Sequence, residues 1–152
     1  MFFTPKNKTD AFEIDSPKLS ISPSTTNVEA MLKDAGSDYK VITDGYIVFP
    51  GCVFGSKIPL MIGIHFTPLK TKFIEIFRPS EYYQSENYDI HTSFSELSQI
   101  LQDKFGEPLM TTAASISGLP CEQWATRNFI VNHYIMDRFG PEEHLHINFY
   151  KR

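Results

Sequence analysis

The chain has no apolar run long enough to cross a membrane as a helix. A bilayer span needs about 20 consecutive apolar residues, and the longest apolar stretch, residues 58–66, contains Pro59 and His65. Residues 1–6 do not combine a basic segment with a following apolar one, so we expect no secretory signal peptide. These features predict a cytoplasmic protein that has no membrane partner.

Cysteine is scarce, and recognisable catalytic motifs are missing. Cys52 and Cys121 have no second ligand at a metal-binding spacing, which favours reduced structural thiols and leaves a disulfide between them open. No serine-hydrolase elbow, phosphate-binding loop or dinucleotide-binding glycine pattern occurs. The sequence therefore predicts a protein that is not an enzyme and that holds no cofactor. Four glycines suit turns and helix ends instead: Gly36, Gly45, Gly55 and Gly106.

Basic residues are sparse in the second half of the chain. Residues 1–80 hold nine Lys or Arg and eight Asp or Glu, whereas residues 81–152 hold five and ten. No Lys or Arg lies between Arg78 and Lys104. Because nucleic-acid binding needs a basic footprint, this distribution argues against a nucleic-acid partner. It fits a basic protein partner, or simply a solvated surface.

Two segments have the signals of a capped amphipathic helix that ends at a glycine. In residues 24–36, Thr26 and Glu29 match a capping box, and Gly36 suits the left-handed position after the helix. In residues 93–108, Ser93 and Glu96 match a second capping box. The apolar stripes of the two helices have helical spacing: Val28, Met31, Leu32 and Ala35, then Phe94, Leu97, Leu101 and Phe105.

The rest of the chain reads as short strands and turns. Asp44-Gly45 between two apolar runs is a strong hairpin signal, and Trp124 is expected beneath the second helix. We predict an α+β fold of two helix-plus-antiparallel-sheet modules in one domain, 1–152, in the order α-ββββ-α-βββ. The expected parts are an arm at 1–23, modules at 24–80 and 92–152, and strands near 40–43, 46–54, 57–66, 72–77, 120–126, 129–137 and 144–150.

Histidines and a cysteine are the first candidates for chemistry. Alternation along the last two strands predicts His133 on the core face and both His144 and His146 on the opposite face. His144 and His146 offer two ligands to a metal, but no local Asp, Glu or Cys completes the set, so we expect no metal site. A nucleophilic pair of Cys121 with His133 is the alternative that would make the protein an enzyme.

The connection 78–91 is the second candidate, because it combines tyrosines with carboxylates. Tyrosine is enriched in binding hot spots, and carboxylates steer a basic partner. The alternative is an ordinary connection whose tyrosines pack on the sheet. The predicted partner-binding residues are Glu81, Tyr82, Tyr83, Glu86, Tyr88 and Asp89, with Glu142 and Glu143 of the last hairpin. A further surface is the sheet face that bears Tyr134, His144 and His146.

Two parts of the chain resemble the S-type pyocin immunity proteins and their relatives among bacterial polymorphic-toxin systems. The first, near 26–50, has Val28-Glu29-Ala30-Met31-Leu32, Gly36, Tyr39, Asp44-Gly45 and Phe49-Pro50. The second, near 94–110, has Phe105-Gly106-Glu107-Pro108 after a helix. The resemblance implies a small cytoplasmic protein without catalytic residues that binds and blocks a cognate toxin domain, as in bacteriocin or contact-dependent inhibition systems.

We therefore expect an immunity protein whose partner is a basic toxin domain, such as a nuclease. Two other classes stay open. A type III secretion chaperone is also small, acidic and mixed in structure, but such chaperones end in a helix, whereas a strand is expected here. A small ligand-binding domain or enzyme would use His133, His144 or Cys121.

Overall fold

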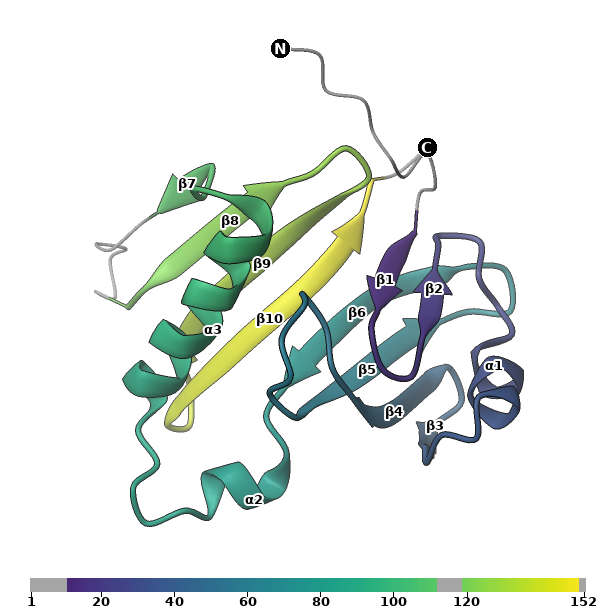
Figure 1. Cartoon of the computed structure of the whole chain (residues 1–152), viewed down its shortest axis with the longest axis horizontal. Helices are drawn as coiled ribbons and strands as arrows, with labels where there is room; N and C mark the ends of the chain where they lie inside the picture. Colours follow the sequence, from purple (N-terminus) through teal and green to yellow (C-terminus); the bar gives the residue numbers. More distant parts are fainter. Residues whose placement is uncertain (1–10, 112–118, 151–152) are drawn as a thin grey trace.

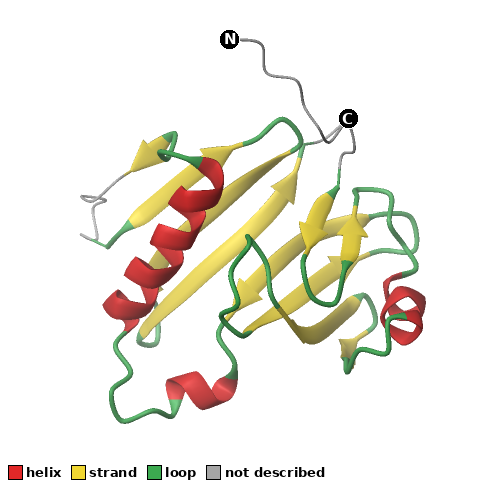
Figure 2. Ribbon diagram, in the orientation of Figure 1, coloured by secondary structure: helices red, strands yellow, loops and turns green. Residues whose placement is uncertain are grey.

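The computed structural model describes residues 11–111 and 119–150, which form an α+β fold (Figures 1 and 2). None of the described helices has the length and apolar character needed to cross a bilayer. The elements are β1 Phe12–Ile14, β2 Leu19–Ile21, α1 Val28–Asp34, β3 Lys40–Thr43, β4 Tyr46–Gly51, β5 Leu60–Phe66, β6 Thr71–Phe77, α2 Ser80–Tyr83, α3 Ile90–Phe105, β7 Met110–Thr111, β8 Cys121–Ala125, β9 Phe129–Asp137 and β10 Pro141–Phe149.

The two predicted modules are the halves of one antiparallel sheet. Its strand order is β3-β4-β5-β6-β10-β9-β8-β7, so each half is a four-strand meander and the last strands of both halves pair in the middle. In this central pair, Ile76 lies opposite Leu145 and Glu75 opposite His146. The predicted order α-ββββ-α-βββ lacks the β1–β2 hairpin, α2 and β7. We call the β6–β10 pair the central seam.

One face of the sheet is covered and the other is open (Figure 1). Helix α3 packs on β9 and β10, and the β1–β2 hairpin and α1 contribute buried side chains to the same core. This core contains aliphatic residues of every long strand and the aromatic rings of Phe49, Trp124 and Phe129. The side chains that alternate with them are half-buried on the opposite side, which we call the open face.

The N-terminal segment contributes to the core over residues 11–23. Phe12 and Ile14 of β1, with Leu19 and Ile21 of β2, are buried. The Phe12 ring contacts that of Phe129 edge to face at 5.6 Å. The sequence predicts a partly flexible arm at 1–23 with at most one short edge strand, at 12–15; the structure has β1 at that place and a second strand, β2, paired with it. Residues 1–10, the rest of that arm, lie outside the described residues.

Helix α1 forms where expected but begins differently. Its N-cap is Asn27, which makes no side-chain capping hydrogen bond. Glu29, expected to complete a capping box with Thr26, accepts a hydrogen bond from the Tyr39 hydroxyl at 2.9 Å instead. At the other end, Gly36 adopts φ +67°, the left-handed conformation predicted for it.

Helix α3 begins four residues earlier than predicted. Its cap is Asp89, whose Oδ1 accepts from the His91 amide at 2.9 Å, whereas Ser93, the expected cap, is buried inside the helix. The helix ends at Gly106 as predicted, with φ +83°. The carbonyl of Gly106 accepts a hydrogen bond from the Trp124 indole at 2.8 Å, which places that buried ring at the C-terminal end of the helix.

Of the two turns expected in the first half of the sheet, one forms as predicted and the other does not. The Asp44-Gly45 hairpin joins β3 and β4, and Gly45 has φ +85°. The strands expected near 46–54 and 57–66, which would leave a tight turn at Gly55-Ser56, are joined by a longer loop, because β4 ends at Gly51 and β5 starts only at Leu60. In this loop Cys52 forms an isolated antiparallel bridge with Ser16. The backbone at Cys52 is therefore held by a residue distant in sequence and not by a neighbouring strand.

Candidate functional site

The predicted tyrosine and acid segment forms α2 and the loop that leads into α3 (Figure 1). Its three tyrosine rings contact one another edge to face, with centroids 6.0 Å apart for Tyr82–Tyr83, 5.5 Å for Tyr82–Tyr88 and 5.2 Å for Tyr83–Tyr88. We call these three residues the tyrosine cluster. Such edge-to-face contacts are favourable beyond simple burial, so the rings form a defined surface feature.

Arg78, the last basic residue before this segment, packs against the cluster. Its guanidinium carbon lies 4.2 Å from the centre of the Tyr82 ring, and its side chain is 3% exposed. The positive charge is therefore withdrawn from the surface, while the Tyr83 side chain remains 40% exposed. Glu81 and Glu86 are exposed beside the cluster, so the surface of this segment is tyrosine-rich and acidic.

Two other predicted partner-binding acids are surface residues that already have contacts. Asp89 is exposed but caps α3. Glu142 lies on the open face, where its Oε2 is 3.3 Å from Arg138 and 3.1 Å from His144 Nε2. The hydrogen bonds from Arg138 and then His144 hold the pKa of Glu142 below its usual value of 4.5. It is therefore a persistent carboxylate at the start of β10.

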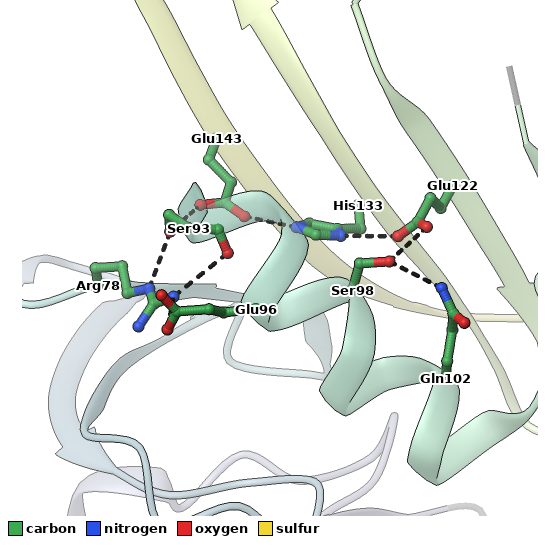
Figure 3. A network of polar contacts seen from close by, with 8 residues as sticks. All are labelled: Arg78, Ser93, Glu96, Ser98, Gln102, Glu122, His133 and Glu143. Carbon is green, nitrogen blue, oxygen red and sulfur yellow. Dashed lines mark hydrogen bonds and ion pairs between the residues drawn. The ribbon is translucent and has the colours of Figure 1, made fainter. Parts of the chain in front are cut away.

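Glu143, the other acid predicted in the last hairpin, points to the opposite side of β10. Its side chain is 4% exposed, because it alternates in phase with the buried Leu145 and Ile147 of the same strand. Glu143 faces α3 and belongs to a buried polar cluster (Figure 3). Its carboxylate is therefore not presented on the surface to which Glu142 belongs.

The centre of this cluster is a histidine held between two glutamates. His133 of β9 is 0% exposed; its Nδ1 lies 3.1 Å from Oε2 of Glu122 on β8, and its Nε2 lies 2.6 Å from Oε2 of Glu143 on β10. The Phe94 ring of α3 stacks on the imidazole at 3.9 Å. An imidazole donates from both nitrogens only when it is protonated, so the geometry fits an imidazolium between two carboxylates.

Helix α3 supplies the remaining hydrogen bonds. The hydroxyl of Ser93 donates to Oε1 of Glu143, and that of Ser98 donates to Oε1 of Glu122, both at 2.6 Å. Arg78 Nε donates to the Ser93 hydroxyl at 3.0 Å. We call the residues of Figure 3 the buried network: Arg78, Ser93, Glu96, Ser98, Gln102, Glu122, His133 and Glu143.

Burial decides what this network can do. His133 resembles a catalytic base held by carboxylates, but it has no exposed surface, and Phe94 covers its ring. In this structure the imidazole is closed off from solvent. The network instead ties one face of α3 to β8, β9 and β10 through charged hydrogen bonds, which are stronger than neutral ones. We interpret it as a structural clamp that fixes the start of α3, and with it the tyrosine cluster.

The clamp makes stability depend on pH. Burial lowers the pKa of His133, but hydrogen bonds and charge from Glu122 and Glu143 outweigh it and leave that pKa above 6.5. The facing groups are these two carboxylates, the Ser93 and Ser98 hydroxyls, and Phe94. A raised pKa in the folded state gives stability that is complete below pH 6.5 and is lost as the pH rises through the folded-state pKa.

We therefore expect the urea midpoint of the parent to fall as the pH is raised from 6.5 towards 9. The fall per pH unit should be steeper for the parent than for a His133→Gln variant. The amide of this variant does not titrate, so any slope that it keeps comes from other groups. The measurement is urea unfolding of both proteins at matched ionic strength. Parallel pH profiles for the two proteins would contradict a charged His133.

The open face carries a chain of stacked rings. His65 stacks between Tyr46 at 4.0 Å and Phe73 at 4.1 Å. Across the central seam, the ring of His146 is 5.5 Å from that of Phe73. It is continued by Tyr134 and His144, whose rings stack at 5.1 Å. The further surface named from the sequence, Tyr134, His144 and His146, is one part of this run of rings, and His144 and His146 face away from His133 as predicted.

The Cys121–His133 pair does not form. Cys121 lies opposite Tyr134 on the open face, whereas His133 pairs with Glu122 and faces the core. The two residues are thus on opposite sides of the sheet, and the hypothesis of a nucleophilic pair was wrong. Cys52 and Cys121 are both free thiols. Within 11–111 and 119–150, no three His, Cys, Asp or Glu side chains are grouped to hold a metal ion.

Sequence reasoning missed the buried network, although a signal for it exists. Glu122 alternates in phase with the buried Trp124, and Glu143 with Leu145 and Ile147. Acids at core-phase positions on strands that flank a core-phase His133 indicate a buried charge cluster. Extending the alternation of β10 by one step towards its start would have moved Glu143 from the surface to this cluster.

Comparisons of the chain with models of known protein families, with curated proteins and with solved structures found no match.

Proposed function

We propose that this protein is a bacterial immunity protein that binds a basic toxin domain and neutralises it by occlusion in the cytoplasm. The observation that carries the proposal is the tyrosine cluster, which stands on a buried arginine among exposed carboxylates. Tyrosine supplies contact area at low entropic cost, and exposed acids accelerate encounter with a basic partner. The resemblance of residues 26–50 and 94–110 to S-type pyocin immunity proteins supports the same conclusion.

The geometry of the segment favours a binding surface over an ordinary connection. Arg78 holds Tyr82 from below, and Tyr88 packs against Ile90, Phe94 and Ile135 under the start of α3. The exposed Tyr83 is therefore supported on two sides by fixed rings. Such pre-ordering reduces the entropy lost on binding.

The proposal is tested first with the protein encoded by the neighbouring reading frame. If that frame encodes a toxin, its C-terminal domain, co-expressed with this chain, is expected to co-purify with it and to be inactive. The toxin domain alone should regain its activity after separation under denaturing conditions and refolding. A toxin domain that remains fully active in the presence of excess chain would refute the proposal.

The tyrosine cluster and the acids should act on different rates of binding. Glu81→Gln with Glu86→Gln is expected to slow association several-fold and to weaken its salt dependence, because such rim charges act on encounter. Tyr83→Ala should instead speed dissociation about 30-fold, equivalent to about 2 kcal/mol for a hot-spot residue. Surface plasmon resonance at two salt concentrations separates the two effects.

Matched control variants are available at exposed positions outside the segment that contains Glu81, Tyr83 and Glu86. Asp34→Asn with Asp38→Asn changes the net charge equally on exposed positions at the end of α1, and Leu69→Ala truncates an exposed side chain in the β5–β6 turn. Both should leave the rates nearly unchanged. If the controls and the cluster variants behave alike, the interface lies elsewhere.

A further inference from the structure

The open face is hollowed at the central seam. A cavity of about 310 Å³ lies over β6 and β10, and its walls include Tyr46, Glu75, Phe77, Glu142, His144 and His146. Glu75 and His146 are direct partners in the register, one from each half of the sheet. The cavity is thus formed jointly by the two halves and combines aromatic rings with two carboxylates.

Each of the two carboxylates has one free oxygen. Both contacts of Glu75, from the Tyr46 hydroxyl and from His65 Nε2 at 3.1 Å, go to Oε1. Both contacts of Glu142, from Arg138 and from His144, go to Oε2. Within the described parts of the chain, Oε2 of Glu75 and Oε1 of Glu142 therefore keep their full capacity to accept hydrogen bonds.

The positions of these carboxylates are fixed by the sheet. Gly63 lies beside Glu75 in the register, and a Cβ at that glycine would come within 2.8 Å of the Tyr46 ring and 2.9 Å of Glu75 Cγ. The glycine therefore leaves room for Tyr46 and Glu75 to pack together over the strand. Tyr46 in turn stacks on His65, so the Glu75 carboxylate is set in a rigid ring framework.

The free carboxylate oxygens of Glu75 and Glu142 make this cavity an acceptor for a cationic hydrogen-bond donor. Burial, and then the charge of His144, lowers the pKa of His146 below 6.5, so this imidazole adds no positive charge at neutral pH. Arg138 contacts Glu142 from the β9–β10 turn, at the margin of the face. A nucleic-acid phosphate is disfavoured, because Glu75 stands at the centre of the ring surface. A planar guanidinium both stacks on rings and pairs with carboxylates.

We propose that this cavity, the seam pocket, receives an arginine side chain of the protein partner. The inference rests on the proposed function, since it takes that partner to be a basic protein. The position supports it: β6 ends at Phe77, three residues before α2 begins, and Glu142 belongs both to the cavity and to the predicted partner-binding acids. The tyrosine cluster, on the α3 side of the sheet, and the seam pocket, on the open face, are then two parts of one interface that extends around this end of β6 and β10.

The pocket is tested without the toxin by titrating N-acetyl-arginine N-methylamide into the full chain and following amide NMR signals. Saturable shifts are expected in residues 73–77 and 142–146. Glu75→Gln should weaken the binding at least about tenfold, because it removes the charged acceptor. N-acetyl-citrulline N-methylamide, which has the same shape without the charge, should not bind measurably.

Two further variants keep the test decisive. Glu107→Gln removes an exposed acid beyond the end of α3 and should bind the probe as the parent does. Glu142→Gln should weaken binding about threefold, and it decides the matter if Glu75→Gln fails to fold. Equal affinity of Glu142→Gln and parent, or equal shifts with the citrulline compound, would overturn the pocket. Free arginine binding far more tightly than the capped form would overturn a protein side chain as occupant.

The outcomes separate the two proposals. If the capped arginine binds and depends on Glu75 while the neighbouring toxin does not bind the chain, the seam pocket stands and the immunity proposal fails. If the toxin binds with the kinetics described above and Glu75→Gln leaves both toxin and probe binding unchanged, the immunity proposal stands and the pocket fails. If both depend on Glu75, the pocket is part of the interface.

Discussion

His133→Leu is expected to lower the free energy of unfolding by about 3–5 kcal/mol, the cost of removing one member of a buried ion pair. The leucine would leave Glu122 and Glu143 facing each other across a dry space, each hydrogen-bonded only to a serine of α3. Either the two carboxylates remain charged at close range, or they take up protons at a cost in free energy. Urea unfolding at pH 6.5 measures the loss.

The opposite face of the same strands provides the control. His144→Leu changes the same residue type where the side chain is half-exposed on the open face, so it should cost only a small part of that loss. Adding Glu122→Gln and Glu143→Gln to His133→Leu should recover stability, because neutral amides still accept from Ser93 and Ser98. A triple variant less stable than His133→Leu would show that the carboxylates do not repel each other.

Leu101→Ala is expected to cost about 2–5 kcal/mol, the range for truncating a fully buried leucine. Leu101 is 0% exposed and belongs to the same core cluster as Leu97 and Trp124. The alanine would leave a cavity between α3 and the sheet, and rigid strands collapse into it poorly. Ser95→Ala, at an exposed position of the same helix, should leave the urea midpoint nearly unchanged. Equal midpoints for Leu101→Ala and the parent would mean that α3 does not pack as described.

The sequence correctly predicts those features of the fold that depend on one residue and its near neighbours in the chain. Gly36, Gly45 and Gly106 lie at the helix ends and the turn expected of them, each with a positive φ, and the alternation of β9 and β10 places His133, His144 and His146 on the correct faces. In these cases steric limits on the backbone or the two-residue period of a strand determine the result.

The predictions were wrong for residues whose hydrogen-bonding partners are distant in sequence. Ser93 matches a capping box with Glu96, yet its hydroxyl contacts Arg78, 15 residues before it, and Glu143, 50 residues after it. Because those partners occupy its hydrogen-bonding capacity, the cap falls to Asp89. The joining of the two modules into one sheet was missed for the same reason: β6 and β10 are distant in sequence, and no local pattern shows that they pair.

The central seam also has a consequence for how the chain folds. Most other neighbours in the sheet are joined by turns or short loops, whereas Ile76 and Leu145, which face each other in the seam, are 69 residues apart. The entropy lost on closing a loop grows with its length, and non-local pairings slow folding. Each meander therefore forms with a smaller loss of chain entropy than the pairing of the two meanders does. The seam pocket exists only after β6 and β10 have paired.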